Sequence, residues 1–442
     1  MSANKEHAWF RPVRAELLRE LTSLVTASKA HSSQGVASAL GKALLTDAVR
    51  EGASDIHITP QTGCVQLRFR VDGALVDVAS LSTEDGMRIL RYFKTAGELP
   101  AGTAFRPQDA RMTFGLEKGE LDLRLATAPC IAGEKLAIRI LDPNRIEQRI
   151  GDLGLRQDDR DQIGLWLGRV SGMFLVAGPT GSGKSTTLYA LLHELKFLER
   201  SVVTVEDPVE YRVDGTAQMQ IDIARGLTFA AGLKAMLRLD PDYLLLGEIR
   251  DPESAQAAVG AASAGRGLLS TLHSRDAVGV VTALRNWDLQ DFEIAAALEM
   301  VVAQRLVRKL CPHCRRLEAP RQEEAQWLES LRLPVPERTW HAGQCDRCRG
   351  IGFSGRTGVF EIWALNKEDY HRILTHDDER SLRENLARQG FHSLLADGLD
   401  MVAEGVTSLD ELRMVGSFFL PPEGCASAQL IERLAATIGG DG

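Results

Sequence analysis

The sequence has little of the positive charge and few of the aromatic side chains that nucleic-acid-binding proteins use. Its 442 residues contain 52 Lys and Arg against 60 Asp and Glu, for a formal net charge of -8, and only 6% are aromatic. A protein that coats nucleic acid needs a basic field to displace counterions, and a groove for single strands needs stacking aromatics. We therefore expect no nucleic-acid partner, although these totals leave room for a local basic patch.

Long apolar runs are also missing. Nowhere does a stretch of about 18 apolar residues run without charge, so we expect no membrane span. Residues Met1 to Arg14 contain neither the apolar core nor the small-residue cleavage site of a secretory signal. These two absences predict a cytoplasmic protein.

Isolated cysteines are few. Four of the seven form two CxxC pairs, Cys311 with Cys314 and Cys345 with Cys348. In a reducing compartment, such pairs favour a metal site over disulfides. Four thiolates give the closed tetrahedral sulfur set that Zn²⁺ prefers, so we predict a structural zinc site. A redox-active CxxC pair and cysteines that bind no metal are the alternatives.

The length allows two to four domains, and the patterns divide the chain into five segments. We expect an N-terminal helical extension at 1–34, an α+β domain at 35–150, an α/β core at 151–310, a tetracysteine zinc module at 311–360, and a helical C-terminal subdomain and tail at 361–442.

Short-range patterns place elements in these segments. Apolar and polar residues alternate from Val65 to Val71 and Asp72-Gly73 follows, which predicts a hairpin. Strands and helices alternate from Met173 to about Arg308, after a charged linker at 142–160, which predicts a mostly parallel sheet. Further helices are expected at 36–50, 84–97, 378–389, 391–405 and 409–415, the last one capped by Ser408, and further strands at 121–125 and 135–140. Past Glu361 the pattern is purely helical.

A phosphate loop follows the apolar strand Met173 to Ala177 and precedes a run that is compatible with a helix. Its residues match GxxxxGK[ST] in full: Gly178, Pro179, Thr180, Gly181, Ser182, Gly183, Lys184 and Ser185, with Thr186 next. The glycines let backbone N–H groups curl around the phosphates of ATP, and the Lys184 ammonium reaches the β- and γ-oxygens. The Ser185 hydroxyl is expected to bind Mg²⁺. This motif predicts an ATP site.

Acidic residues follow two short apolar strands. Glu248 comes just after Tyr243 to Leu246, at the usual position of the acid that acts through Mg²⁺-bound water. Glu206, Asp207 and Glu210 follow Val202 to Val205, where a general base is expected. Such acids are also common as helix caps and loop residues, which is the alternative role for this cluster.

A histidine ends a third strand-like run. His273 follows Gly267 to Leu272, and this position makes it a candidate sensor of the γ-phosphate. A lone histidine after a strand more often has a structural role, and that alternative stays open.

These motifs resemble, in order and spacing, those of the ATPases of type II secretion systems and type IV pili. The resemblance rests on EDPVE (206–210), GEIRD (247–251), STLH (270–273) and AQRLVRKLC (303–311). It extends upstream to SDIHITP (54–60), FRVDG (69–73), RPQDAR (106–111) and GEK (133–135), and downstream to SGRTGVFEI (354–362) and GVTSLDEL (405–412), so it covers roughly residues 35–416.

The resemblance implies a RecA-like ATPase domain preceded by a smaller α+β domain, assembled as a homo-hexamer that hydrolyses ATP. It implies that Glu210 is the general base, Glu248 the Walker B acid and His273 the sensor, with Glu206 also at the nucleotide. Arg111 and Arg124 match the arginines that approach the nucleotide from the N-terminal domain. A solvated strand face is the alternative for both arginines.

The same resemblance implies a motor at the cytoplasmic face of the inner membrane that acts on a membrane platform protein and powers assembly of a pseudopilus or pilus. Membrane association is then made only through partners. Within the family, the tetracysteine insert is typical of assembly rather than retraction ATPases.

Two departures from the family pattern bear on activity. Arg266 stands where the first histidine of the His box is usual, and Ser274-Arg275 replace Thr-Asn. They leave open a nucleotide-binding scaffold with little hydrolysis. A RecA-like nucleic-acid motor and a retraction motor also stay open as hypotheses.

Overall fold

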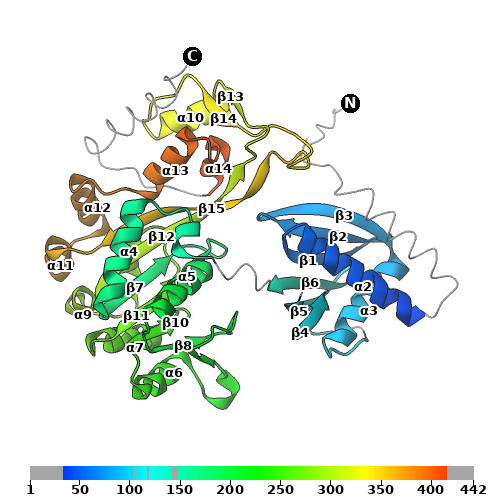
Figure 1. The fold of residues 1–442 in the computed structure, drawn as a ribbon, viewed down its shortest axis with the longest axis horizontal. Coiled ribbons are helices and arrows are strands. Elements are labelled where there is room, and N and C mark those ends of the chain that lie inside the picture. The colour runs from blue at the N-terminus through cyan, green and yellow to red at the C-terminus, as the bar shows by residue number, and fades with distance from the viewer. Residues whose placement is uncertain (1–32, 103–104, 117–118, 142–147, 416–442) are drawn as a thin grey trace. The chain divides into compact units, whose positions relative to one another are not determined.

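The computed structural model describes residues 33–102, 105–116, 119–141 and 148–415 (Figure 1). The first of two units holds the described residues up to 141, and the second holds nearly all of those from 148 onward. Each unit has its own sheet and its own hydrophobic core. The helix expected within the first thirty residues lies outside the described residues. No described helix is long and apolar enough to cross a membrane.

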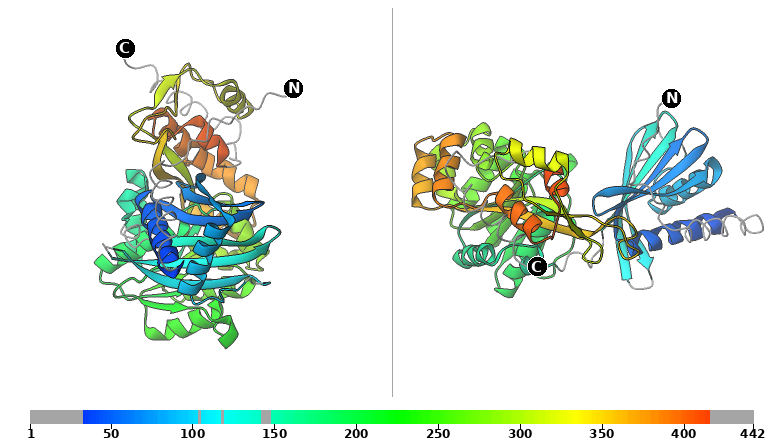
Figure 2. Two further views of the ribbon diagram at one scale, coloured as in Figure 1. Left: turned by 90° about the vertical axis from the view of Figure 1, so that its right-hand side faces the viewer. Right: turned by 90° about the horizontal axis from the view of Figure 1, so that it is seen from above.

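In the described part of the first unit, six antiparallel strands form one sheet in the order β3-β2-β1-β6-β5-β4. They are β1 (Ala53–Gln61), β2 (Cys64–Val71), β3 (Ala74–Ser82), β4 (Gln108–Leu116), β5 (Gly119–Cys130) and β6 (Gly133–Leu141). Alternate residues such as Ile56 and Ile58 are fully buried, which gives the sheet one apolar face. The helices α2 (Ser33–Arg50) and α3 (Thr83–Ala96) contact each other and cover that face, as Figures 1 and 2 show.

Most local predictions for this unit are confirmed. The two-residue turn at Asp72-Gly73 joins β2 to β3, and the predicted helices correspond to α2 and α3. Helix α3 begins where predicted because the Ser82 hydroxyl accepts a hydrogen bond from the N–H of Asp85. Strand β4 was not predicted, since the polar sequence of its first half hides the alternation.

The second unit is built on a seven-stranded sheet in the order β15-β12-β7-β11-β10-β8-β9 among the described residues. Its strands are β7 (Gly172–Ala177), β8 (Val202–Glu206), β9 (Ala217–Gln220), β10 (Tyr243–Leu246), β11 (Gly267–Leu272), β12 (Leu298–Leu310) and β15 (Phe353–Ala364). All neighbouring pairs are parallel except β12 with β15. The predicted α/β fold with a mostly parallel sheet is therefore confirmed.

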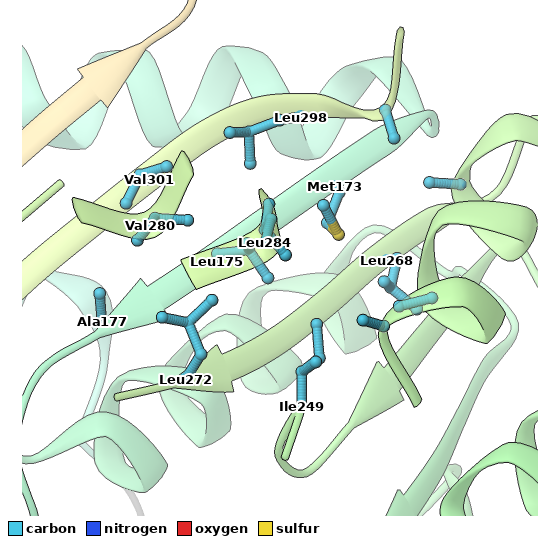
Figure 3. Close-up of a cluster of buried hydrophobic side chains, with 14 of the residues drawn as sticks. Met173, Leu175, Ala177, Ile249, Leu268, Leu272, Val280, Leu284, Leu298 and Val301 are labelled. Atoms are coloured by element: carbon cyan, nitrogen blue, oxygen red, sulfur yellow. The ribbon is translucent and has the colours of Figure 1, made fainter. Parts of the chain in front are cut away.

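Both faces of this sheet are covered by helices. Helices α4 (Gln157–Arg169) and α5 (Lys184–Phe197) pack on one face, while α6 (Phe229–Met236), α7 (Pro252–Ser263), α8 (Gly279–Asn286) and α9 (Asp291–Ala297) pack on the other. A hydrophobic core lies on each face of the sheet, and alternate residues of β7 point into the two cores. Met173 and Leu175 belong to one core, and Phe174 and Val176 belong to the other. Figure 3 shows part of the first core, in which Leu284 of α8 lies among strand residues. Burial on both faces explains why the central strands β7 and β10 are unbroken apolar runs in the sequence.

The cysteine module is an insertion between two strands of the central sheet. It contains β13 (Arg316–Glu318), α10 (Gln322–Ser330) and β14 (Thr339–His341). The module was predicted to extend to residue 360, whereas the structure places 353–364 in β15, paired with β12 from Met300 to Leu310. The pairing of two strands that are distant in the sequence cannot be predicted from the residue pattern of either strand alone.

Up to residue 415, where the described residues end, four helices follow β15: α11 (Lys367–Leu374), α12 (Glu379–Arg388), α13 (Leu394–Ala403) and α14 (Leu409–Met414). The last three correspond to the predicted helices, and the Ser408 hydroxyl caps α14 as expected. Two boundaries differ from the predictions. Strand β15 continues to Ala364 before the helical part begins, and α4 starts at Gln157, inside the predicted linker.

A buried carboxylate ties these helices to the central sheet. Glu361 of β15 accepts hydrogen bonds from the N–H groups of Ala277, at 2.8 Å, and Leu394, at 3.0 Å. Burial raises the pKa of Glu361 to about 7. The segment that leads into α8 and the start of α13 are thereby held by one side chain.

Candidate active site

The phosphate loop connects β7 to α5, so it lies at the carboxyl end of a central parallel strand. Helix α5 begins at Lys184, and its first N–H groups therefore face the loop. A Cβ atom on Gly178 would lie 2.5 Å from the Ser182 hydroxyl oxygen and 2.6 Å from the Gln304 carbonyl oxygen, and Gly183 has a φ of 91°. Neither position has room or a backbone angle for an ordinary L residue. The predicted role of the glycines thus has a geometric basis.

Gln304 of β12 supports the loop from behind. Its amide nitrogen donates to the Ser182 carbonyl oxygen at 2.7 Å, and its amide oxygen accepts from the Thr187 hydroxyl at 2.8 Å. The residue is 1% exposed. No role was predicted for Gln304 from the sequence; the available signal was a single amide directly after the apolar run Met300 to Ala303.

The Lys184 ammonium lies on the loop itself. It donates to the carbonyl oxygens of Gly178, at 2.8 Å, and Pro179, at 3.1 Å. Burial lowers the pKa of Lys184, and the nearby Arg305 guanidinium lowers it further, while the Glu248 carboxylate acts in the opposite direction. The lysine and the predicted Walker B acid are therefore within electrostatic reach of each other.

The remaining predicted ligands of the nucleotide lie around this loop. Pro179, Thr180 and Gly181 are exposed on it, and Ser185 and Thr186 lie in the first turn of α5, where Thr186 is exposed. A hydroxyl at a helix N-terminus, with Glu248 on the neighbouring side of the loop, is a donor set that suits Mg²⁺. These placements agree with the predicted contacts without testing them.

Glu248 and His273 form a pair. The Nε2 atom of His273 lies 3.1 Å from the Oε1 atom of Glu248, and its Nδ1 atom lies 3.2 Å from the Gly178 carbonyl oxygen. Both ring nitrogens thus face acceptors, and both contacts are hydrogen bonds only when both nitrogens carry a proton. The structure brings together the phosphate loop, the predicted acid and the predicted sensor, from the ends of three parallel strands.

Arg250 completes this group, although no role was predicted for it from the sequence. Its Nε donates to the Oε2 atom of Glu248 at 2.9 Å, and its Nη1 donates to an Asp207 carboxylate oxygen at 3.2 Å. The guanidinium also lies over the ring of Phe229, 5.4 Å from its centroid. Burial acts to lower the pKa of Arg250, but the two carboxylates outweigh it and raise the pKa.

Glu206 is directed into the protein. It is 4% exposed, and it accepts hydrogen bonds from Tyr189, at 2.5 Å, and Thr204, at 2.6 Å, with Gln218 at 3.2 Å. Burial and the Glu206 carboxylate together raise the pKa of Tyr189. In this conformation Glu206 supports the segment after β8, and its predicted contact with the nucleotide stays a prediction.

Glu210 lies four residues beyond the end of β8 and is half-buried. It is close enough to Tyr189 to raise the pKa of that hydroxyl. Within the described residues it forms no hydrogen bond or ion pair, so the structure does not join it to Glu248 or His273. Its role as general base stays a prediction.

Arg266 lies at the far end of β11 from His273. The strand Gly267–Leu272 separates the two residues by about 20 Å at the usual strand rise. Arg266 instead pairs with Asp240 at 3.1 Å. The substitution in the His box is therefore remote from the phosphate loop.

Arg111 and Arg124 face each other on β4 and β5 of the first unit, and Arg124 is also paired in register with Arg139 of β6. Arg139 forms an ion pair with Asp55 at 3.1 Å. A cross-strand row of like charges is unfavourable for the sheet itself. Such a row favours a role in binding over a merely solvated face, and the approach of Arg111 and Arg124 to the nucleotide stays a prediction.

The four paired cysteines of the inserted module converge. The Sγ atoms of Cys311 and Cys345 are 3.8 Å apart, those of Cys314 and Cys348 are 3.6 Å apart, and all four lie within 4.8 Å of one another. A tetrahedral zinc site with Zn–S bonds near 2.3 Å has sulfur atoms about 3.8 Å apart. The N–H of Gly352 also donates to the Cys348 sulfur at 3.2 Å, a contact that supports a thiolate ligand. The donor set therefore fits zinc.

The chain is similar in sequence to proteins of secretion and pilus systems. Residues 29–414 match the family described as "Type II/IV secretion system protein". A "Type II secretion system ATPase E" of Vibrio cholerae is 39% identical over 84% of this chain and 74% of its own length. A "Putative type II secretion system protein E" of Escherichia coli is 38% identical over 86% of this chain and 77% of its own length. A "Type IV pilus assembly ATPase TfpB" of Acinetobacter baylyi is 38% identical over 84% of this chain and 64% of its own length.

Solved structures share the fold. The ATPase DotB of Legionella pneumophila has a TM-score of 0.62 and 20% identity, and the match covers 85% of this chain and 94% of DotB. The pilus retraction motor PilT, solved with bound ADP, has a TM-score of 0.56 and 20% identity over 85% of this chain and 96% of PilT. At this level of identity the likeness concerns the fold alone. From the sequence relatives and the phosphate-loop fold together, the chain belongs to the type II/IV secretion system protein family and is an ATPase.

Proposed function

We propose that this ATPase works as a cytoplasmic homo-hexamer that hydrolyses ATP to power assembly of a pseudopilus or a type IV pilus. The observation that carries the proposal is the convergence of Lys184, Glu248 and His273 on the phosphate loop, with the His273 ring between the Gly178 carbonyl and the Glu248 carboxylate. A loop that only bound nucleotide would not need an acid and an imidazole at this place.

The side chains divide the work of hydrolysis. Lys184 exchanges its two loop carbonyls for phosphate oxygens, which are stronger partners for an ammonium. Glu210 takes the proton of the attacking water. The His273 ring, which contacts Glu248, also contacts the γ-phosphate and so senses whether ATP is bound. Arg111 and Arg124 of the first unit supply positive charge to the transition state.

A magnesium ion bound at Ser185 would neutralise phosphate charge and order the attacking water. Glu248 is expected to hold the outer side of that site. The charge already present on Lys184 and the partial positive charge of the α5 N-terminus act on the same oxygens.

The tetracysteine module supports the assembly role because, within the family that the chain resembles, this insert is typical of assembly ATPases. Residues that follow the first CxxC pair anchor the C-terminal helices: Arg315 lies over the Trp340 ring and donates to the Glu404 carbonyl. Arg308, just before the pair, binds Glu411 of α14. Zinc held by the four thiolates would fix this junction between β12, β15 and α14.

The proposed partner is an inner-membrane platform protein, contacted from the cytoplasmic side. Relatives named for type II secretion and for type IV pilus assembly share 38–39% identity with the chain, which supports this assignment for both kinds of system. The acidic net charge of -8 gives no support to a nucleic-acid partner.

Steady-state phosphate release with Mg-ATP tests the proposal. The native chain should hydrolyse ATP, Lys184→Ala should lose binding and turnover, and Glu248→Gln and Glu210→Gln should keep binding and lose turnover. The mass of the ring in solution, measured with and without a non-hydrolysable ATP analogue, tests the hexamer. Stimulation by the cytoplasmic domain of the platform protein tests the partner.

The contrary outcome is equally specific. If the native chain binds ATP and shows no turnover with the platform domain present, it is a nucleotide-dependent scaffold. Hydrolysis without the platform but strong stimulation by single-stranded DNA would instead identify a nucleic-acid motor.

A further inference from the structure

We propose that Arg250 is a positioning residue for ATP hydrolysis, which holds the Glu248 carboxylate in one orientation and ties it to the segment that carries Glu210. The inference rests on the proposed role of Glu248. The residue itself is not placed in contact with the phosphates.

The first support is the way Glu248 is held. Its Oε1 atom faces His273 at 3.1 Å and its Oε2 atom accepts from Arg250 at 2.9 Å, so each oxygen has a donor of its own. A carboxylate fixed at both oxygens cannot rotate about its last torsion. Without Arg250, the carboxylate would keep a single contact and could turn away from the loop.

The second support is that the same guanidinium reaches the neighbouring strand end. Strands β10 and β8 are parallel neighbours, with Leu246 opposite Val205, and the acids follow directly after them. Arg250 spans the gap by donating to Asp207 at 3.2 Å. Asp207 belongs to the stretch that leads to Glu210, so one side chain sets the two acidic segments relative to each other.

The third support is that a purely structural role fits poorly. The Arg250 side chain is 46% exposed, and exposed ion pairs contribute little to stability because water screens them. Its guanidinium also lies over the Phe229 ring, 5.4 Å from the centroid, a contact that is weak at an exposed site. An arginine that stabilises the fold so little, yet fixes a predicted catalytic acid, is better explained by orientation.

The chain offers a matched control. Arg372 of α11 also bridges two carboxylates, with its Nε 3.2 Å from Glu368 and its Nη1 2.9 Å from Asp377, and its side chain is 27% exposed. It lies among the C-terminal helices, away from the phosphate loop. Changing Arg372 removes the same kind of bridge without touching Glu248.

The experiment compares Arg250→Gln, Arg250→Lys and Asp207→Asn with Arg372→Gln in the full chain. For each variant, kcat and KM for Mg-ATP, the Kd of a fluorescent ATP analogue and the thermal midpoint are measured. Arg250→Gln should lower kcat roughly 10- to 100-fold, as loss of a supporting hydrogen bond at a reactive group does, while KM and Kd stay within about twofold.

The other variants are expected to lower kcat less than Arg250→Gln does. Arg250→Lys should restore only part of the activity, since one ammonium cannot span both carboxylates. Asp207→Asn should fall between the native chain and Arg250→Gln. Arg372→Gln should keep the native kcat at a similar thermal midpoint.

The outcomes separate this inference from the proposed function. Native kcat in Arg250→Gln, alongside an inactive Glu248→Gln, would overturn the positioning role and leave the proposed function intact. If Arg250→Gln loses ATP binding and its thermal midpoint falls as well, the positioning role is also overturned, because the role of Arg250 would then be structural. An active Glu248→Gln would overturn the role of Glu248, and the positioning role of Arg250 with it, while ATP hydrolysis by the chain would stand.

Discussion

Replacing Gln304 by leucine should weaken nucleotide binding, because the amide of this buried residue holds the phosphate loop from behind. Its nitrogen donates to the Ser182 carbonyl and its oxygen accepts from the Thr187 hydroxyl. Leucine has a similar volume and leaves both of those polar groups without their partner. The perturbation therefore removes two hydrogen bonds and adds almost no cavity.

The magnitude follows from the burial. Each buried polar group left without a partner costs about 1–3 kcal/mol, so the two together cost roughly 2–6 kcal/mol. Water can reach the loop more easily than the core, which puts the expected loss at the lower end. If the substitution destabilises the ATP-binding conformation of the loop by about 2 kcal/mol, the Kd for ATP rises about 30-fold.

Titration with a fluorescent ATP analogue measures this change directly. A suitable control is Asn385→Leu, since Asn385 is also a buried amide, 2% exposed, and donates to Asp369 at 3.1 Å within the C-terminal helices. Both variants should lower the thermal midpoint, but only Gln304→Leu should raise the Kd. An unchanged Kd in Gln304→Leu would refute the idea that this amide shapes the phosphate loop.

Three further predictions concern the metal, a buried acid and the altered His box. Metal analysis should find about one zinc per chain, and a chelator should lower the thermal midpoint; a metal-free chain with an unchanged midpoint contradicts the site. Burial raises the pKa of Glu361 from 4.5 to about 7, so its contribution to stability is complete below about pH 4.5 and is lost as the pH rises through 7. The shift corresponds to roughly 3 kcal/mol, and Glu361→Gln should therefore show a flatter dependence of the urea midpoint between about pH 5 and 8; equal slopes would exclude Glu361 as the source. Arg266→His should keep kcat within about twofold, since Arg266 pairs with Asp240 at the far end of β11; a large gain in turnover would show that this position acts on the site.

The site could be predicted where its residues lie close together in the sequence. The phosphate-loop motif is eight consecutive residues, Gly178 to Ser185, that run from the end of a strand into the first turn of a helix. Its conformation depends on glycines that can be identified directly in the sequence. The two CxxC pairs likewise carry their own geometry, because a two-residue spacing already places two thiolates on one metal. The hairpin at Asp72-Gly73 and the cap at Ser408 are local for the same reason.

What the sequence could not decide depends on contacts between distant segments. Thr187 and Gln304 are 117 residues apart, and only the pairing of β12 with β7 brings them together. The bridge from Arg250 to Asp207 crosses 43 residues and needs β10 beside β8.

The amino-acid sequence by itself thus determined the chemistry available to this ATPase: a phosphate loop, candidate acids, a histidine and a set of thiolates. The tertiary structure decided which of these groups meet. It turned Glu206 inward onto Tyr189, placed Arg266 far from the loop, and returned β15 to the central sheet. The physical reason is that strand order in a parallel sheet is set by the packing of whole elements, whereas a local pattern reports only on its own turn or strand.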